Sequence, residues 1–270
     1  MITNKTASAC ALFIGITAVS IAPAVHAQSR AVTTTNFELA VDSADSDTSG
    51  STSNGTLGGA LIANVPLGNL FGLSLSGGYA TTTVRTRDVL IDLDTSGNEV
   101  RPSCSFENLS GEIGLFARRP TLGKIGLSYG VGEVSADCSV SSVFIPSGDD
   151  TLDTDGYRAE IEGYLGNFTL GASYASLNLD DGPKLETTTV TASWYPIDSV
   201  RVSLFGNDMY DDNSYGLLLE HQPEFLGDGF GVKIGYTRSD GEPNMRIVQL
   251  GLSYYFGKRV PLKIRDRQYR

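Results

Sequence analysis

The chain has 270 residues, of which 40% are hydrophobic, a content and length that allow one large β domain. It carries 31 Asp and Glu against 20 Lys and Arg, for a formal net charge of −11 at pH 7. This acidic balance argues against nucleic acid as a partner, because affinity for nucleic acid depends on cationic contacts with phosphate, and it is compatible with an acidic pore or acidic surface loops.

Residues 1–27 have the features of a cleavable secretory signal peptide. Lys5 is the only charge in this stretch, and an apolar run over residues 9–19 follows it. The run is short for a membrane-spanning helix, which needs ~20 apolar residues, so an N-terminal anchor is the less favoured alternative. Val25 and Ala27 place small residues at the −3 and −1 positions of a cleavage site. We therefore predict export and removal of residues 1–27.

Alternating apolar and polar residues recur throughout residues 28–256. A period of two predicts β-strands with two different faces. Short connectors rich in turn formers alternate with connectors that are mostly longer and dense in Asp, Ser, Thr and Gly, such as 43–55, 86–103 and 138–155. The expected strands lie near 34–42, 56–66, 72–85, 105–118, 124–137, 156–165, 168–179, 185–195, 199–207, 214–222, 229–237 and 245–256.

The two faces of these strands differ in the way expected of a membrane barrel. One face is apolar, as at Leu39, and the other carries Gly, Ser and charges, as at Ser128. Twelve strands enclose more space than apolar side chains readily fill, so an outward apolar face needs lipid. The predicted fold is an all-β transmembrane antiparallel barrel, with short periplasmic turns, longer acidic external loops, and Trp194 and Tyr254 in an interfacial girdle. A secreted soluble β-sandwich is the alternative.

The last strand candidate carries the most specific signal, an alternating segment that ends in aromatic residues, Leu250–Phe256. It resembles the terminal strand of the outer-membrane β-barrel (porin-like) superfamily of Gram-negative bacteria. The wider resemblance covers 28–256 and lies in pattern. It implies a bacterial outer-membrane location after export through the periplasm, with membrane lipid and the barrel assembly machinery as partners. In that superfamily the aromatic residue usually ends the chain; here a basic segment, 257–270, follows and is expected as an unstructured periplasmic tail.

Charged residues on the polar face are expected to line a channel. Arg201, Glu220 and Lys233 are related by hairpin symmetry, which places them side by side on three adjacent strands at mid-depth. Inward charges must be paired or hydrated, because isolated buried charges are costly. They form either a salt-bridged cluster that closes the lumen or a constriction that filters solutes by charge. The expected lining set is Glu38, Asp42, Glu112, Arg158, Glu160, Glu162, Arg201, Glu220 and Lys233.

Two further patterns concern crosslinks and metals. Cys104 and Cys138 are symmetric about the turn at Thr121, which predicts a disulfide at the outer end of this hairpin. Three segments alternate oxygen-bearing residues before a glycine, as in the first half of a calcium loop, but the closing bidentate Glu is missing. These segments are 45–50, 92–97 and 151–156. We expect them to be solvated loops without a cofactor, and calcium binding is the alternative.

The functional expectation is a channel rather than an enzyme. His221 is the only histidine after residue 27, it has lipid-facing parity, and the chain has no Gly-x-Ser-x-Gly elbow. We expect passive passage of small hydrophilic solutes or ions, with a preference for cations because the inward carboxylates identified above outnumber the inward bases. Two alternatives are a non-conducting structural or adhesive barrel, plugged by its own side chains and loops, and an outer-membrane lipase or protease.

Overall fold

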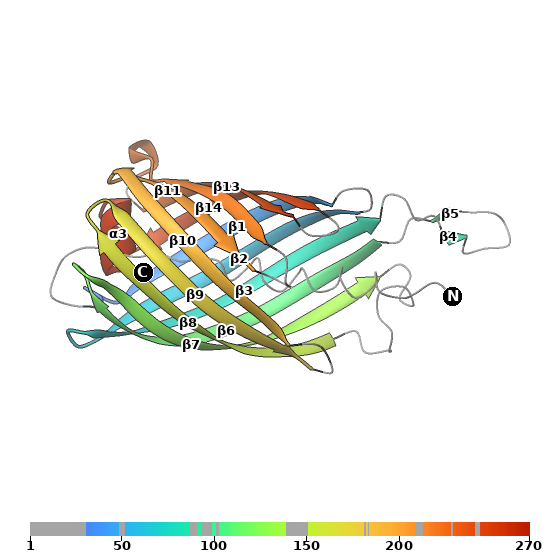
Figure 1. Cartoon of the computed structure of the whole chain (residues 1–270), viewed down its shortest axis with the longest axis horizontal. Coiled ribbons are helices and arrows are strands. Elements are labelled where there is room, and N and C mark those ends of the chain that lie inside the picture. Colours follow the sequence, from blue (N-terminus) through green and yellow to red (C-terminus); the bar gives the residue numbers. More distant parts are fainter. Residues whose placement is uncertain are drawn as a thin grey trace.

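A computed structural model describes residues 31–48, 52–86, 91–92, 99–100, 103–138, 151–180, 182, 184–208, 213–227, 229–240 and 244–270. Within these residues, twelve antiparallel strands close into one barrel (Figure 1). They are β1 (Asn36–Thr48), β2 (Thr52–Leu67), β3 (Phe71–Thr86), β6 (Ser103–Arg119), β7 (Gly123–Cys138), β8 (Thr151–Leu165), β9 (Phe168–Leu179), β10 (Leu185–Ile197), β11 (Val200–Asn207), β12 (Ser214–His221), β13 (Phe230–Ser239) and β14 (Met245–Phe256). The expected all-β class and barrel architecture are confirmed.

The strands follow one another around the barrel in sequence order, and β1 closes it by pairing with β14. A separate ladder of β4 (Ile91–Asp92) and β5 (Glu99–Val100) lies between β3 and β6 in the sequence. The tight turns gather at one end of the barrel, here called the short-turn end. Gly68 and Gly166 lie in two of these turns at positive φ values of 91° and 58°, a backbone conformation that favours glycine.

Strands extend further than the sequence pattern predicted at the opposite end, here called the loop end. The segment 43–55, expected as an acidic loop, belongs mainly to β1 and β2, which run to Thr48 and from Thr52. Strand β8 begins at Thr151 rather than near 156. Both faces of a strand contact water once it leaves a membrane, so its sequence there loses the apolar alternation that identifies strands.

An apolar band covers the outside of the barrel. Such a continuous apolar surface is unusual for a soluble monomer and suits contact with lipid. At the short-turn end, the ring of Tyr254 lies 4.7 Å from that of Phe230 and 4.6 Å from that of Phe256. The exposed band includes Leu39, Leu61, Leu127, Leu170, Trp194, Leu204, Ile234 and Leu250. Among the described residues, no helix has the length and apolar character needed to span a bilayer.

The segment after β14 returns into the barrel. Helix α3 (Leu262–Gln268) lies inside the short-turn end (Figure 1). Its residues from Arg265 to Gln268 are buried. The segment before β1 lies beside it, and the backbone N–H of Thr33 donates to the carbonyl of Gln268 at 3.1 Å. The expectation of an unstructured basic tail is therefore wrong for these residues, because the lumen offers carboxylates that pair with the tail's arginines.

Candidate functional site: a lumen closed by the C-terminal tail

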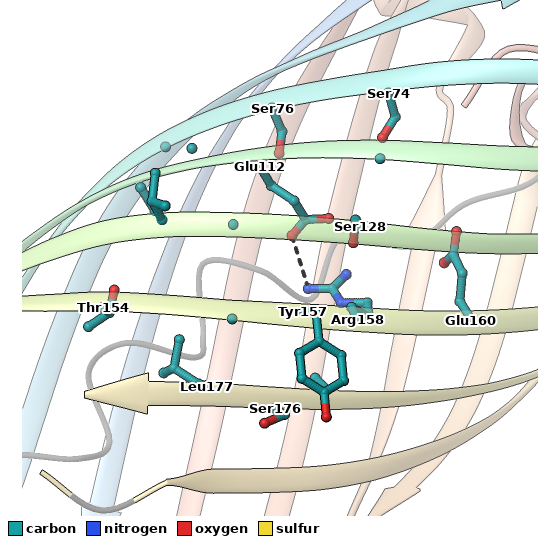
Figure 2. A pocket seen from close by; sticks show the side chains of 18 of the residues that line it. Ser74, Ser76, Glu112, Ser128, Thr154, Tyr157, Arg158, Glu160, Ser176 and Leu177 are labelled. Carbon is teal, nitrogen blue, oxygen red and sulfur yellow. Dashed lines mark ion pairs between the residues drawn. The ribbon is translucent and has the colours of Figure 1, made fainter. Parts of the chain in front are cut away.

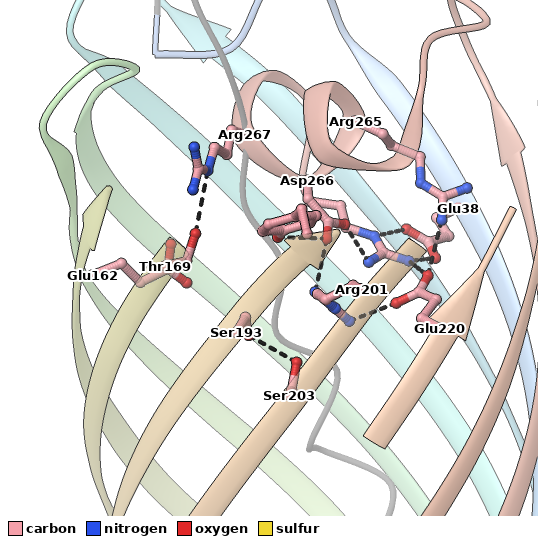
Figure 3. A network of polar contacts seen from close by, with 12 residues as sticks. Glu38, Glu162, Thr169, Ser193, Arg201, Ser203, Glu220, Arg265, Asp266 and Arg267 are labelled. Carbon is pink, nitrogen blue, oxygen red and sulfur yellow. Dashed lines mark hydrogen bonds and ion pairs between the residues drawn. The ribbon is translucent and has the colours of Figure 1, made fainter. Parts of the chain in front are cut away.

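Glu220 on β12 is the centre of an ion-pair network in the lumen (Figure 3). The carboxylate is fully buried and accepts hydrogen bonds from Arg201 on β11, from Arg265 at 2.9 Å and from Arg270 at 3.1 Å. The register pairs Arg201 with Glu220 and Glu220 with Lys233, as hairpin symmetry predicted. The predicted depth was wrong: Glu220 is the penultimate residue of β12, beside the short turns, and not at mid-depth.

Two further carboxylates complete the network around Arg270. Its Nε donates to Glu38 Oε2 at 2.6 Å, and its Nη1 donates to Asp266 Oδ1 at 2.7 Å. The other oxygen of Asp266 accepts from Arg201 at 2.8 Å and from the Tyr195 hydroxyl at 3.0 Å. Strands β1, β10, β11 and β12 are thus all joined to the tail through buried, charge-assisted hydrogen bonds.

The network keeps Arg270 charged although its side chain is buried. Burial by itself would lower the pKa of Arg270, but the nearby carboxylates of Glu220, Glu38 and Asp266 raise it well above its ordinary value. An intact buried network of this kind is weak evidence for high stability, because desolvation offsets the attraction. Removal of one member is costly, since it leaves a buried charge without its partner.

Inward-facing aromatic rings contact two arginines of the tail, Arg265 and Arg267. The guanidinium of Arg267 lies 5.2 Å from the ring centre of Tyr164 and 5.3 Å from that of Tyr195. Arg265 lies 5.9 Å from the ring centre of Tyr255. Such cation–π contacts strengthen when they are withdrawn from water. These tyrosines end strands at the short-turn end with inward parity, so their contact with the tail distinguishes them from the outward aromatic girdle.

Arg118 ties the two chain segments inside the lumen to each other. Its Nη1 donates to the carbonyl of Ala31 at 3.1 Å, and its Nη2 donates to a main-chain oxygen of Arg270. Val32 and Phe116 pack together beside it in a small buried cluster. The described residues before β1, 31–35, and the tail therefore lie together inside the short-turn end.

A cavity of about 280 Å³ lies against the inner wall and reaches the tail at Arg270. Ion pairs join Arg158 to Glu112 at 3.6 Å and Lys124 to Glu160 at 2.5 Å within it. The first pair projects across a wall of small residues (Figure 2). The remaining lining includes Asn64, Ser74, Ser76, Gly78, Asn108, Ser110, Gly114, Ser128, Gly130 and Ala175. The arrangement can hold a small polar solute, and Arg270 of the tail forms part of its lining.

Solved structures with similar folds are outer-membrane barrels. The TodX deltaS2S3 mutant monoaromatic hydrocarbon channel has a TM-score of 0.52 and 12% identity, over 84% of this chain and 91% of that one. This chain has the outer-membrane β-barrel fold. The KdgM porin in complex with disordered oligogalacturonate has a TM-score of 0.45 and 11% identity, over 81% of this chain and 99% of that one.

An autotransporter barrel is also among the similar solved structures. The translocator domain of autotransporter NalP from Neisseria meningitidis has a TM-score of 0.45 and 12% identity, over 82% of this chain and 88% of that one. No protein-family model matches the chain, and no curated protein matches it. At these identities the similarity shows the fold and not the activity.

All the residues expected to line this outer-membrane β-barrel face its lumen, but they divide between two regions. Glu38, Arg201, Glu220 and Lys233 are buried at the tail, and Glu112, Arg158 and Glu160 line the cavity. Glu162 accepts from the Tyr164 hydroxyl at 3.1 Å, and Asp42 lies in register with Gly251 of β14. The structure thus brings the expected set to one surface without making it a single constriction.

The expected excess of inward carboxylates is absent from the described lumen. The tail adds three arginines and one aspartate, and two bases on β6 and β7 also face inward. The expectation was wrong because these two were not assigned to the inner face and the tail was placed outside. The lumen charges are Glu38, Asp42, Glu112, Glu160, Glu162, Glu220 and Asp266 against Arg118, Lys124, Arg158, Arg201, Lys233, Arg265, Arg267 and Arg270.

The remaining sequence patterns fall outside the lumen site or at the loop end. Cys104 and Cys138 are directly opposite each other on β6 and β7, a register compatible with a disulfide. His221 is exposed on the outer face, with its Nδ1 3.2 Å from the carbonyl of Ser199.

Two of the three calcium-like segments fall largely on strands. Residues 45–48 belong to β1 and residues 151–156 to β8, and an extended strand does not curl around a cation. Residues 93–98 lie outside the described part of the chain. In the part that the structure describes, no three His, Cys, Asp or Glu side chains gather in a way that could hold a metal ion.

Proposed function

We propose that the chain is an outer-membrane channel for small hydrophilic solutes whose path is closed at rest by its own C-terminal tail, residues 257–270. The observation that carries the proposal is the continuity of the cavity with the tail, since Arg270 forms part of both. The described tail residues belong to no barrel strand, so the tail can leave without opening the strand ladder. Its release would extend the cavity to the short-turn end.

The membrane setting supports this assignment. An apolar exterior needs lipid around it. In the proposed orientation the short-turn end, where the tail lies, faces the periplasm. The proposed partners are outer-membrane lipid and the barrel assembly machinery, reached after export with the signal 1–27 removed. His221 lies on the outer face, away from the cavity, which favours a channel over a hydrolase that uses this histidine.

The charges support only weak ion selectivity. With the tail in place, inward acids and bases are nearly balanced. Release of the tail removes Arg265, Arg267 and Arg270 together with Asp266, which leaves a slight excess of carboxylates on the wall. We therefore expect a mild cation preference in the open state.

Liposome swelling tests the proposed passage. A chain truncated after Phe256 ends on the aromatic residue of the last strand, as outer-membrane barrels usually do, and its folding is checked by heat-modifiable migration. Proteoliposomes with the truncated barrel are expected to swell in small sugars faster than those with the full chain. Equal, background swelling of both folded proteins would favour the second candidate, a non-conducting structural barrel, which the buried ion-pair network at the tail also fits.

A further inference from the structure

We propose that the cavity bordered by Arg270 of the tail binds a small zwitterion of the α-amino acid class. The ligand carboxylate would pair with Arg158 and its ammonium group with Glu112. The inference deepens the proposed channel function, because it names the solute class of the same cavity. Binding is nevertheless measurable on the closed barrel, without any transport.

The Glu112–Arg158 pair projects from the wall into open space. Glu112 on β6 and Arg158 on β8 are separated by β7, where their register partners are Gly130 and Ser128. Both β7 residues are small, so the two charged side chains extend over them into the cavity (Figure 2). Ala175, the β9 partner of Arg158, is also small.

This pair is looser than the other ion pair of the cavity. Its atoms are 3.6 Å apart, and the side chains are 23% and 24% exposed. Lys124 and Glu160 are 2.5 Å apart, and the lysine is only 7% exposed. A long, partly exposed ion pair contributes less stability than a short, buried one, so a ligand that offers each group a new partner can separate it at lower cost.

The charge pattern selects a ligand that carries both signs. An anion alone on Arg158 would add a negative charge beside Glu112, and a cation alone on Glu112 would add a positive charge beside Arg158. A zwitterion satisfies both groups with charge-assisted hydrogen bonds. The hydroxyls of Ser76 and Ser110 and the amide of Asn108 line the same cavity and provide neutral partners for a polar side chain.

Ligand-observed saturation-transfer NMR on the full chain, folded in detergent, tests the proposal with L-glutamine as the probe. Two matched compounds lack one charge each: glutaramate has no amino group, and 4-aminobutanamide has no carboxylate. L-Glutamine is expected to bind, with both analogues at least tenfold weaker. Glu112→Gln and Arg158→Gln are each expected to weaken binding roughly tenfold, or ~1.4 kcal/mol. Glu133→Gln, exposed on the outer face of β7, is the control and should change nothing.

Two further variants separate loss of the site from loss of folding. Ala175→Leu keeps both charges but fills the cavity, so it should abolish binding in a folded barrel. The exchange Glu112→Arg with Arg158→Glu keeps one charge of each sign and should restore binding relative to either single variant.

Three results would overturn the inference. Glutaramate binding as tightly as L-glutamine would define an anion site, and 4-aminobutanamide doing so would define a cation site. Absence of L-glutamine binding to the folded full chain would exclude the zwitterion site altogether. If binding is absent while the truncated barrel still admits sugars, the ligand class is wrong and the proposed channel stands.

Discussion

Replacement of Glu220 by glutamine should release the C-terminal tail. The wild-type carboxylate is fully buried and compensates Arg201, Arg265 and Arg270 at once. Glutamine keeps the shape but removes the negative charge, so three buried guanidinium groups lose their shared counter-charge. Breaking a buried ion pair on one side costs ~3–5 kcal/mol. Even the lower figure corresponds to a roughly hundredfold larger population of the released tail.

Amide hydrogen exchange measures this population directly. In helix α3 the backbone N–H of Arg265 donates to Pro261 and that of Tyr269 donates to Arg265, so both amides exchange only when the helix opens. The peptide 257–270 should exchange roughly a hundredfold faster in Glu220→Gln than in the wild type, while the barrel strands keep their protection.

An exposed ion pair provides the matched control. Arg238 Nε and Asp240 Oδ1 are 2.9 Å apart, with side chains 45% and 49% exposed. Such surface pairs contribute ~0–1 kcal/mol, so Asp240→Asn should leave exchange of helix α3 unchanged. Exchange of the helix within a factor of ~2 of wild type in a folded Glu220→Gln barrel would show that the network does not hold the tail.

Three other predictions concern separate parts of the barrel. Oxidised protein should carry no free thiol at Cys104 and Cys138, and reduction should lower the free energy of unfolding by ~3 kcal/mol; a mass measurement that finds two free thiols would contradict the disulfide. Tyr195→Phe removes the hydroxyl that donates to Asp266, so helix α3 should exchange about fivefold faster, and no change would exclude a holding role for this bond. Fluorescence of Trp194, the single tryptophan, should be quenched most by lipids brominated near the headgroup, and stronger quenching from the acyl-chain ends would place it outside the girdle.

The strands could be predicted because outward-facing residues must be apolar to contact lipid, whereas the alternate, inward-facing residues can be small or polar. The predicted strand boundaries, 168–179 for β9 and 245–256 for β14, match those of the structure at both ends. At the loop end the alternation of apolar and polar residues is no longer required, because both faces of the strand contact water. For that reason the beginning of β8 and the end of β1 had loop-like sequences.

The ion-pair network in the lumen could be predicted only in part. Strand register followed from hairpin symmetry, which placed Glu220 between Arg201 and Lys233. The role of the tail did not follow, because its arginines have no periodic pattern and their partners come from distant strands. One signal for the tail was present in the sequence. Tyr164 and Tyr195 have inward parity at the short-turn end, so their rings cannot contact lipid and need another partner inside the barrel.

Single-channel conductance in planar bilayers tests the central claim, closure of the barrel by its own tail. The full chain is expected to remain closed for most of the recording, with rare openings. The barrel truncated after Phe256, shown to be folded, is expected to give stable open steps with a mild cation preference. A truncated barrel that inserts and stays silent, or a full chain that conducts equally well, would contradict the account.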